Sequence, residues 1–183
     1  ETRYGAFRAL TTLDEHDPFV RGENLDDQFV LHILDTDGPP MIHLTKRQKA
    51  EVVLFGADQR FKTPIAVRAG NHILITGQPG SDSIIVSRYE AGKDDDKRKE
   101  VSTRVADVIR TVVEFGASYP DVAQMLVQAD RQHSIASRIE IDALPQAGRV
   151  YFRENSANSD GNQSKARIGN VKTIPNLFAA EGN

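Results

Sequence analysis

Two histidines that lie near each other in the sequence could bind a metal ion together. His32 and His43 each lie in a short apolar run, and the turn residues Asp37 and Gly38 lie between the two runs. If these turn residues form a two-residue hairpin loop, the two runs pair as antiparallel strands. That register places His32 directly opposite His43. Two imidazoles at cross-strand distance can bind a transition metal such as zinc.

A zinc site needs three or four protein ligands, so the pair requires a further one, for which Glu51 and His72 are candidates. Strand alternation places both histidines on one face, which they share with Val30, Leu34, Met41 and Thr45. The opposite face is entirely apolar and consists of Phe29, Leu31, Ile33, Ile42 and Leu44. The alternative to a metal site is a stacked or hydrogen-bonded histidine pair on a half-buried sheet.

A second pair of chemically active side chains is Glu140 and Asp142. Paired carboxylates can divide the roles of acid and base. Arg138 shares their face of the predicted strand 138–144, however, and the intervening residues are apolar. This pattern is typical of a solvent-facing side of a strand. The sequence has no H-E-x-x-H, G-x-S-x-G or dinucleotide-binding motif, so it predicts no catalytic residue and no cofactor.

The histidines belong to a β-rich block of the chain. Its predicted strands are short, rich in β-branched residues and separated by Gly, Pro, Asn and Asp turns. They cover residues 29–34, 41–44, 51–55, 64–68, 71–76 and 83–89. A spacing of roughly ten residues per strand favours antiparallel hairpins in a sandwich or small barrel. The run 29–34 is apolar on both faces, which indicates a central strand.

Two helices are predicted after the β-rich block. The first ends at Gly116, and its apolar face consists of Val105, Val108, Ile109, Val112 and Val113. The second begins with Ser118 as its cap, with Pro120 in the first turn and Asp121 three residues after the cap. They form an α-hairpin, and strand 138–144 then turns into strand 149–153. The predicted fold is therefore α+β: a sandwich or small barrel, a packed α-hairpin, a closing β-hairpin and an N-terminal helix.

The N-terminal helix is expected over residues 3–13, where Tyr4, Phe7, Leu10 and Leu13 share one face. The order T-R-x-x-A-x-x-A-L in Thr2–Leu10 resembles the second helix of a HEAT repeat, whose alanines let neighbouring helices approach closely. The alternative is a lone helix that covers the domain. The expected organisation is this helix in 1–18, an α+β domain in 19–153, and a polar linker and tail with a short apolar docking segment in 154–183.

Charge and hydropathy limit the classes of partner. The chain has a net charge of −3 and no cysteine, so neither a basic nucleic-acid footprint nor a disulfide is expected. No apolar run approaches the ~18 residues of a membrane span. The order of elements in 103–153 also fits a winged helix, but the segment 118–130 contains no Lys or Arg. Binding to DNA through that helix would therefore be weak.

Several stretches together resemble a known family. They are ETRYGAFRAL, DGPPMIHLT, VVLFGADQRF, VSTRVADVIRTVVEFGASYPDVAQML and SRIEIDALPQAGRVYF. Over residues 1–153 they resemble the C-terminal region of large bacterial flagellar P-ring-like proteins, where this region follows helical repeats. The resemblance implies a non-enzymatic structural protein of the cell envelope or periplasm, with a protein or peptidoglycan-proximal partner. The alternatives are a metal-dependent enzyme or metal-binding domain that uses His32 and His43, and a winged-helix-like binding module.

Overall fold

The computed structural model describes residues 2–14, 16–45, 49–89 and 97–142. The chain divides into two units, Glu1–Leu144 and Pro145–Asn183, and every described residue belongs to the first. The acidic run at 94–96, the predicted strand 149–153 and the tail 154–183 lie outside the described residues.

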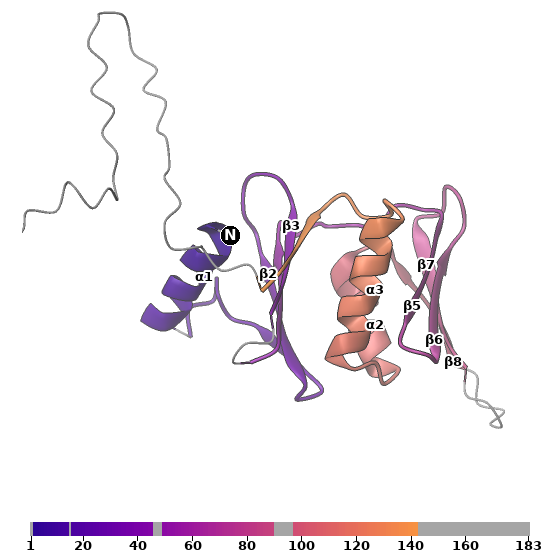
Figure 1. The fold of residues 1–183 in the computed structure, drawn as a ribbon, viewed down its shortest axis with the longest axis horizontal. Helices are drawn as coiled ribbons and strands as arrows, with labels where there is room; N and C mark the ends of the chain where they lie inside the picture. The colour runs from indigo at the N-terminus through magenta and orange to yellow at the C-terminus, as the bar shows by residue number, and fades with distance from the viewer. Residues whose placement is uncertain (1, 15, 46–48, 90–96, 143–183) are drawn as a thin grey trace, which may run out of the picture. The chain divides into compact units, whose positions relative to one another are not determined.

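A five-stranded sheet forms one layer of the first unit (Figure 1). Its strands follow the spatial order β1 (Glu23–Leu25), β2 (Phe29–Leu34), β4 (Glu51–Phe55), β3 (Met41–Thr45) and β9 (Arg138–Ile141). The β2–β4 and β3–β9 pairs are parallel, and the β1–β2 and β3–β4 pairs are antiparallel. The strand β4 is buried at every position, which fits its place in the centre of the sheet.

A four-stranded antiparallel sheet forms a second layer. Its strands are β5 (Ile65–Ala69), β6 (Ile73–Gly77), β7 (Ser83–Arg88) and β8 (Lys97–Ser102), in that spatial order. Sequence patterning does not predict β8, because its residues Lys97, Arg98 and Lys99 resemble a solvated charged loop. Strand β8 lies at the edge of the sheet, where charged side chains are common because they oppose pairing with another chain.

Helices α2 (Val105–Glu114) and α3 (Tyr119–Arg131) lie between the two sheets (Figure 1). Gly116 ends the turn after α2 with a φ of 89°, a left-handed conformation that glycine adopts without strain. The predicted cap of α3 is confirmed, since the Ser118 N–H donates to Asp121 Oδ2 at 2.8 Å. Both helices and the facing sides of both sheets contribute to one large apolar core.

Helix α1 (Thr2–Leu13) lies on the other side of the five-stranded sheet, away from α2 and α3. It buries Tyr4 and Phe7 against the sheet, but Leu10 and Leu13, which were expected on the same face, are exposed because they lie on the flank of the helix that is turned away from the sheet. A second, smaller apolar cluster forms there from Tyr4, Phe7, Val20, Leu34, Met41, Val53 and Phe55. We call this side of the five-stranded sheet its outer face, and the side that packs on α2 and α3 its inner face.

The α+β class is confirmed, with three helices and two sheets in a broadly sandwich-like arrangement and no closed barrel among the described residues. Two details differ from the expectation. The helices lie between the sheets, and the five-stranded sheet is mixed because two of its pairs are parallel. The strand expected to open a closing hairpin, β9, pairs with β3 along its described length.

Candidate functional site

The predicted face of the histidines is correct, but their predicted pairing is wrong. His32 pairs with Val53 of β4, and Val53 pairs in turn with His43 of β3. The two histidines therefore share the outer face, with β4 between their strands. Two strand spacings separate their backbones by about 10 Å, and the His43 ring is fully buried and stacked on the Tyr4 ring.

The reason for the different register lies in the strands themselves. The run Val52–Phe55 is apolar at every position, so β4 is most stable with a neighbour on both sides and both faces covered. The link between β2 and β3 contains Pro39 and Pro40, which have no backbone N–H to donate to a tight hairpin. The chain therefore places β4 between β2 and β3 instead of pairing them directly.

The candidate further ligands do not complete a metal site. Glu51 is on the outer face, but its carboxylate accepts from Tyr4 Oη at 3.3 Å and from Arg8 Nη1 at 3.2 Å. His72 lies before β6, in the other sheet. In the ranges 2–14, 16–45, 49–89 and 97–142, no three or more His, Cys, Asp or Glu side chains gather closely enough to hold a metal ion.

His43 is part of the packing beneath α1. Its ring stacks on the Tyr4 ring with centroids 3.6 Å apart, and the side chain is fully buried. Neither ring nitrogen has a hydrogen-bond partner. Burial lowers the pKa of His43 to about 4, so the imidazole is neutral at pH 7. His43 therefore acts as a flat aromatic surface for α1.

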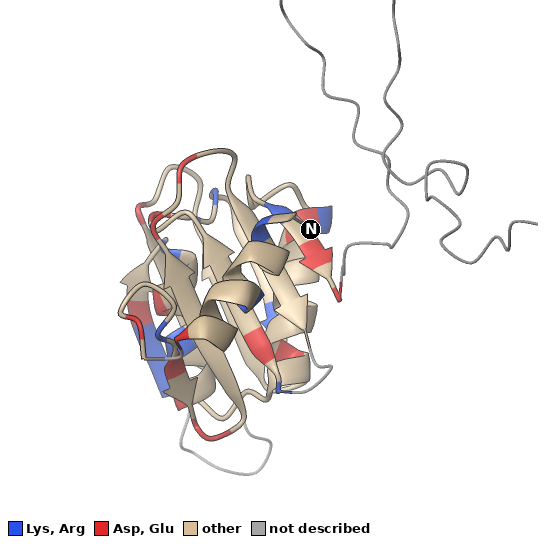
Figure 2. Ribbon diagram, turned by 90° about the vertical axis from the view of Figure 1, so that its left-hand side faces the viewer, with Lys and Arg blue, Asp and Glu red and all other residues tan. Residues whose placement is uncertain are grey.

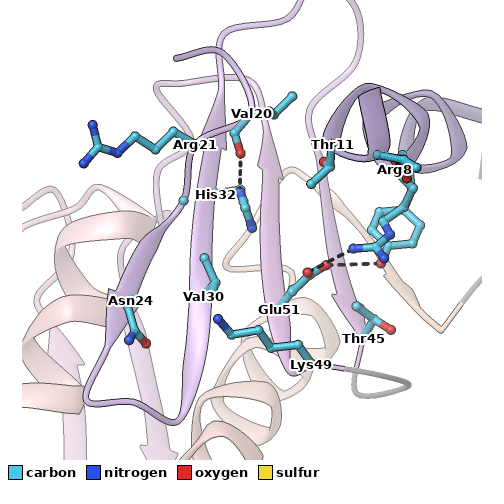
Figure 3. Close-up of a pocket in the computed structure, with 13 residues that line it drawn as sticks. Arg8, Thr11, Val20, Arg21, Asn24, Val30, His32, Thr45, Lys49 and Glu51 are labelled. Atoms are coloured by element: carbon cyan, nitrogen blue, oxygen red, sulfur yellow. Dashed lines mark hydrogen bonds and ion pairs between the residues drawn. The ribbon is translucent and has the colours of Figure 1, made fainter. Parts of the chain in front are cut away.

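A cleft of about 830 Å³ lies beside this packing (Figure 3). It is bounded by α1, by the segment 20–24 and by the outer face of the sheet. Its lining residues are Tyr4, Arg8, Thr11, Thr12, Val20, Arg21, Gly22, Asn24, Val30, His32, Thr45, Lys49 and Glu51. Volumes of about 300–1,000 Å³ are common for sites that bind small molecules. Of the two predicted histidines, only His32 reaches this cleft.

His32 is held in one orientation. Its Nδ1 lies 2.9 Å from the Val20 carbonyl oxygen, and the Phe7 ring packs edge-on at a centroid distance of 4.8 Å. Gly22 lies so close that a Cβ at this position would overlap both His32 and Val30. Burial lowers the pKa of His32, partly opposed by the Glu51 carboxylate. A neutral imidazole with a fixed ring is the result.

The predicted strand 138–144 also contributes to the outer face. Asp142 accepts a hydrogen bond from Thr45 Oγ1 at 2.6 Å, and Glu140 pairs with His43 in the register of β9 and β3. Arg138 forms an ion pair with Glu140. These carboxylates therefore have structural partners at the edge of the sheet, and the cleft is lined by Glu51 instead.

Sequence reasoning missed most of the cleft. Tyr4 and Arg8 come from α1, where their spacing of four residues signals only that they share a helix face. Lys49 precedes β4 in a turn and carries no motif. A polar position at Glu51, at the head of an otherwise apolar strand, was the signal that could have identified the cleft, since buried carboxylates require partners.

Two other kinds of interface considered from the sequence are a winged-helix surface on α3 and a membrane-spanning helix. Helix α3 buries Tyr119, Val122, Met125, Leu126 and Ala129 between the sheets. Strand β9 joins β3 and forms no wing hairpin within the described residues. None of the described helices is both long and apolar enough to cross a membrane.

Comparisons of the chain with protein-family models, with curated proteins and with solved structures found no match.

Proposed function

We propose that this chain is a non-catalytic structural or interaction domain of a larger bacterial cell-envelope protein, and that α1 is its docking element. The observation that carries the proposal is that α1 has apolar residues on two sides. One side packs on the outer face of the sheet through Tyr4 and Phe7. The other side remains exposed.

The exposed side of α1 has the spacing of a helix-packing surface. Ala6, Ala9, Leu10 and Leu13 are all exposed and follow the pattern i, i+3, i+4, i+7. Leu10 is 44% exposed and Leu13 is 83% exposed. Seen from this side, most of the helix carries no charge (Figure 2). We call these four residues the exposed α1 stripe.

A helix of a partner is the occupant that this stripe fits best. The two alanines allow close approach of a neighbouring backbone, and the two leucines supply side chains that fill the grooves of a facing helix. Contiguous exposed apolar residues commonly mark interaction sites. Phe19, which follows α1 in the chain, is also 45% exposed. The resemblance of Thr2–Leu10 to a HEAT-repeat helix supports the same kind of partner.

The cellular setting of the proposal rests on the resemblance of residues 1–153 to flagellar P-ring-like proteins. It implies a periplasmic or cell-envelope location, and a protein partner in a peptidoglycan-proximal assembly of the flagellar basal body. The chain's net charge of −3 gives no electrostatic support for a nucleic-acid partner.

Photo-crosslinking in the bacterium tests the proposal. A photoreactive amino acid replaces Leu10 or Leu13 in the full-length protein, and a matched control replaces the exposed Lys62. We expect adducts with an envelope protein from the two α1 positions and none from position 62. If the protein is folded and both α1 positions give no adduct, or give adducts only with cytoplasmic proteins, the proposal is wrong.

A further inference from the structure

The cleft beneath α1 contains a buried hydrogen-bonding atom that has no partner. His32 is 6% exposed, and its Nε2 atom makes no hydrogen bond. Figure 3 shows the edge of the ring opposite Val20 directed into the cleft. Leaving a buried polar atom without a partner costs free energy, because its hydrogen bonds to water are lost and not replaced. A ligand that supplies the missing partner would remove this cost.

The contacts of His32 fix which chemistry this atom offers. A carbonyl oxygen can only accept, so the ring nitrogen next to the Val20 carbonyl, Nδ1, must carry the proton. In the neutral ring Nε2 is then a hydrogen-bond acceptor. The charged groups that face the ring are Glu51 from β4, Arg8 from α1 and Lys49 from the preceding turn. A ligand atom that meets Nε2 must therefore be a donor, and a hydroxyl and an ammonium are two donors that the charges of the cleft can tell apart.

The charges around the cleft decide between these two donors. Arg8, Arg21 and Lys49 line it together with a single carboxylate, Glu51. Glu51 already accepts from Arg8 and Tyr4, so most of its charge is balanced. An ammonium would meet an excess of positive charge. A hydroxyl meets no such repulsion, and an acidic group on the same ligand would be attracted.

The remaining lining fits a hydroxylated ligand. Asn24 lines the cleft with a side-chain amide, and three threonine hydroxyls line it that already donate within the chain and can still accept from a ligand hydroxyl: Thr11, Thr12 and Thr45. Val20 and Val30 add apolar surface to the lining. Small polar side chains together with apolar surface suit a ring that has hydroxyls at its edge and C–H groups on its face.

We propose that this cleft binds a small hydroxylated anion of the sugar-acid or sugar-phosphate class. A ligand hydroxyl donates to His32 Nε2, a second hydroxyl contacts the Glu51 carboxylate, and the acidic group lies against Lys49 with Arg21 at the rim. This site goes beyond the proposed docking role of α1. The cleft contacts Tyr4, Arg8 and Thr11, which project from the opposite side of the helix to the exposed α1 stripe. Either proposal can therefore fail without the other.

Nuclear magnetic resonance titrations on the ¹⁵N-labelled protein test the site. The probes are glucuronate, gluconate and glucose 6-phosphate, which distinguish a carboxylate from a phosphate. There are three controls. Glucose lacks the negative charge, succinate lacks the hydroxyls, and glucosamine carries a positive charge instead of a negative one. We expect a saturable shift of His32 ¹⁵Nε2 with at least one probe. Affinity should be at least tenfold weaker for each control.

Two variants assign the response to the cleft. Lys49→Met should weaken binding of the responding probe about tenfold, because a rim charge is lost and the core is untouched. Lys62→Met removes an exposed lysine outside the cleft and should leave binding unchanged. Because His32→Phe removes the acceptor, it should abolish the binding.

Three outcomes would overturn the proposal. One is the absence of a saturable shift with all three probes. Another is an equal response to succinate or glucose, since the site would then not require both a negative charge and hydroxyls on the ligand. The third needs no ligand: the ¹⁵N shifts of the His32 ring report which nitrogen carries the proton, and a proton on Nε2 in the free protein contradicts the acceptor role.

Discussion

The inner and outer faces of the five-stranded sheet are built from alternate residues of the same strands, yet they differ in character. On the inner face, Leu31, Ile42, Leu44, Val52 and Leu54 join the large core shared with α2 and α3. On the outer face, His32, His43, Thr45 and Glu51 are buried among aromatic side chains of α1. The apolar face stabilises the fold, while the polar face orients side chains towards a cleft.

The difference is clearest on β4. Val52 and Leu54 are buried in the large core. Glu51, the first residue of the strand, lies on the outer face, where its carboxylate accepts hydrogen bonds from Tyr4 and Arg8. Hydrogen bonds have directional geometry and apolar contacts do not. We therefore expect substitutions on the inner face to reduce stability most, and substitutions on the outer face to change orientation, pH response and binding.

The largest expected effect comes from two leucines with equal exposure on opposite faces. Leu54 and Leu34 are both 1% exposed. Leu54→Ala leaves a cavity in the closed core and should lower the free energy of unfolding by about 4 kcal/mol. Leu34→Ala should cost about 2 kcal/mol, because α1 lies beside an open cleft and can relax into the space. Urea denaturation measures both, and equal costs would contradict the distinction between the faces.

The second effect is a loss of stability in acid. The pKa of His43 is lowered from 6.5 to about 4, so between these values the unfolded chain binds a proton that the folded chain does not. Stability is fully present above pH 6.5 and falls as the pH drops towards 4, by about 3 kcal/mol for this group. The lowered pKa of His32 acts in the same direction.

His43→Phe is the control for the acid effect, because it keeps an aromatic ring under Tyr4 and removes the titrating group. The variant should lose about 3 kcal/mol less than the wild type between about pH 7 and 4. Urea denaturation at each pH measures the stability of both proteins. Equal losses in the two proteins would assign the acid sensitivity to other groups.

The third effect is a disturbance of the cleft itself. Gly22→Ala introduces a Cβ that overlaps Val30 and the His32 ring, so it should cost about 2 kcal/mol as overpacking. The ring resonances of His32 should shift at the same time. In a His32→Ala background the same substitution should cost clearly less, and an unchanged cost would mean that the ring does not confine Gly22.

The fourth effect compares two tyrosines on the two sides of the sheet. Tyr4→Phe removes the hydroxyl that donates to Glu51 and should cost about 1 kcal/mol. Tyr119, on the inner side, packs through its ring on Phe29 with centroids 5.6 Å apart, so Tyr119→Phe should change stability by less than about 0.5 kcal/mol. Thermal unfolding distinguishes them, and a reversed order would contradict the polar role of Tyr4.

The smallest effect is expected on the exposed α1 stripe. Because Leu13 is 83% exposed, Leu13→Asp should change the free energy of unfolding by less than about 0.5 kcal/mol. The same substitution in the full-length protein should reduce partner crosslinking from position 10. A large loss of stability in the isolated chain would show instead that this side of α1 packs within the domain.

Local sequence patterns predicted many of the elements and their faces. The alternation in β2 and β3 correctly placed His32 and His43 on one face and the apolar residues on the other. Ser118 and Asp121 correctly marked the start of α3, because the capping interaction is local. The charged edge strand β8 and the three-residue β1 were missed, since neither has the apolar alternation that identifies a strand.

The candidate site was predicted only in part. The sequence pointed to His32, which lines the cleft, but with His43 as its cross-strand partner and a metal as its ligand. Its actual neighbours Phe7, Val20 and Gly22 lie 25, 12 and 10 positions earlier in the sequence. Side chains brought together across α1, the segment 20–24 and β4 share no sequence period, so no local pattern could connect them.

By itself, the sequence determined most of the strands and helices and which face of each apolar strand is buried, because these follow from the two-residue period of a strand and the 3.6-residue period of a helix. Only the tertiary structure decided that β4 inserts between β2 and β3, that α2 and α3 lie between the sheets, and that α1 covers the polar face. These choices depend on which surfaces are buried together, and that free energy is a property of the whole domain rather than of any segment.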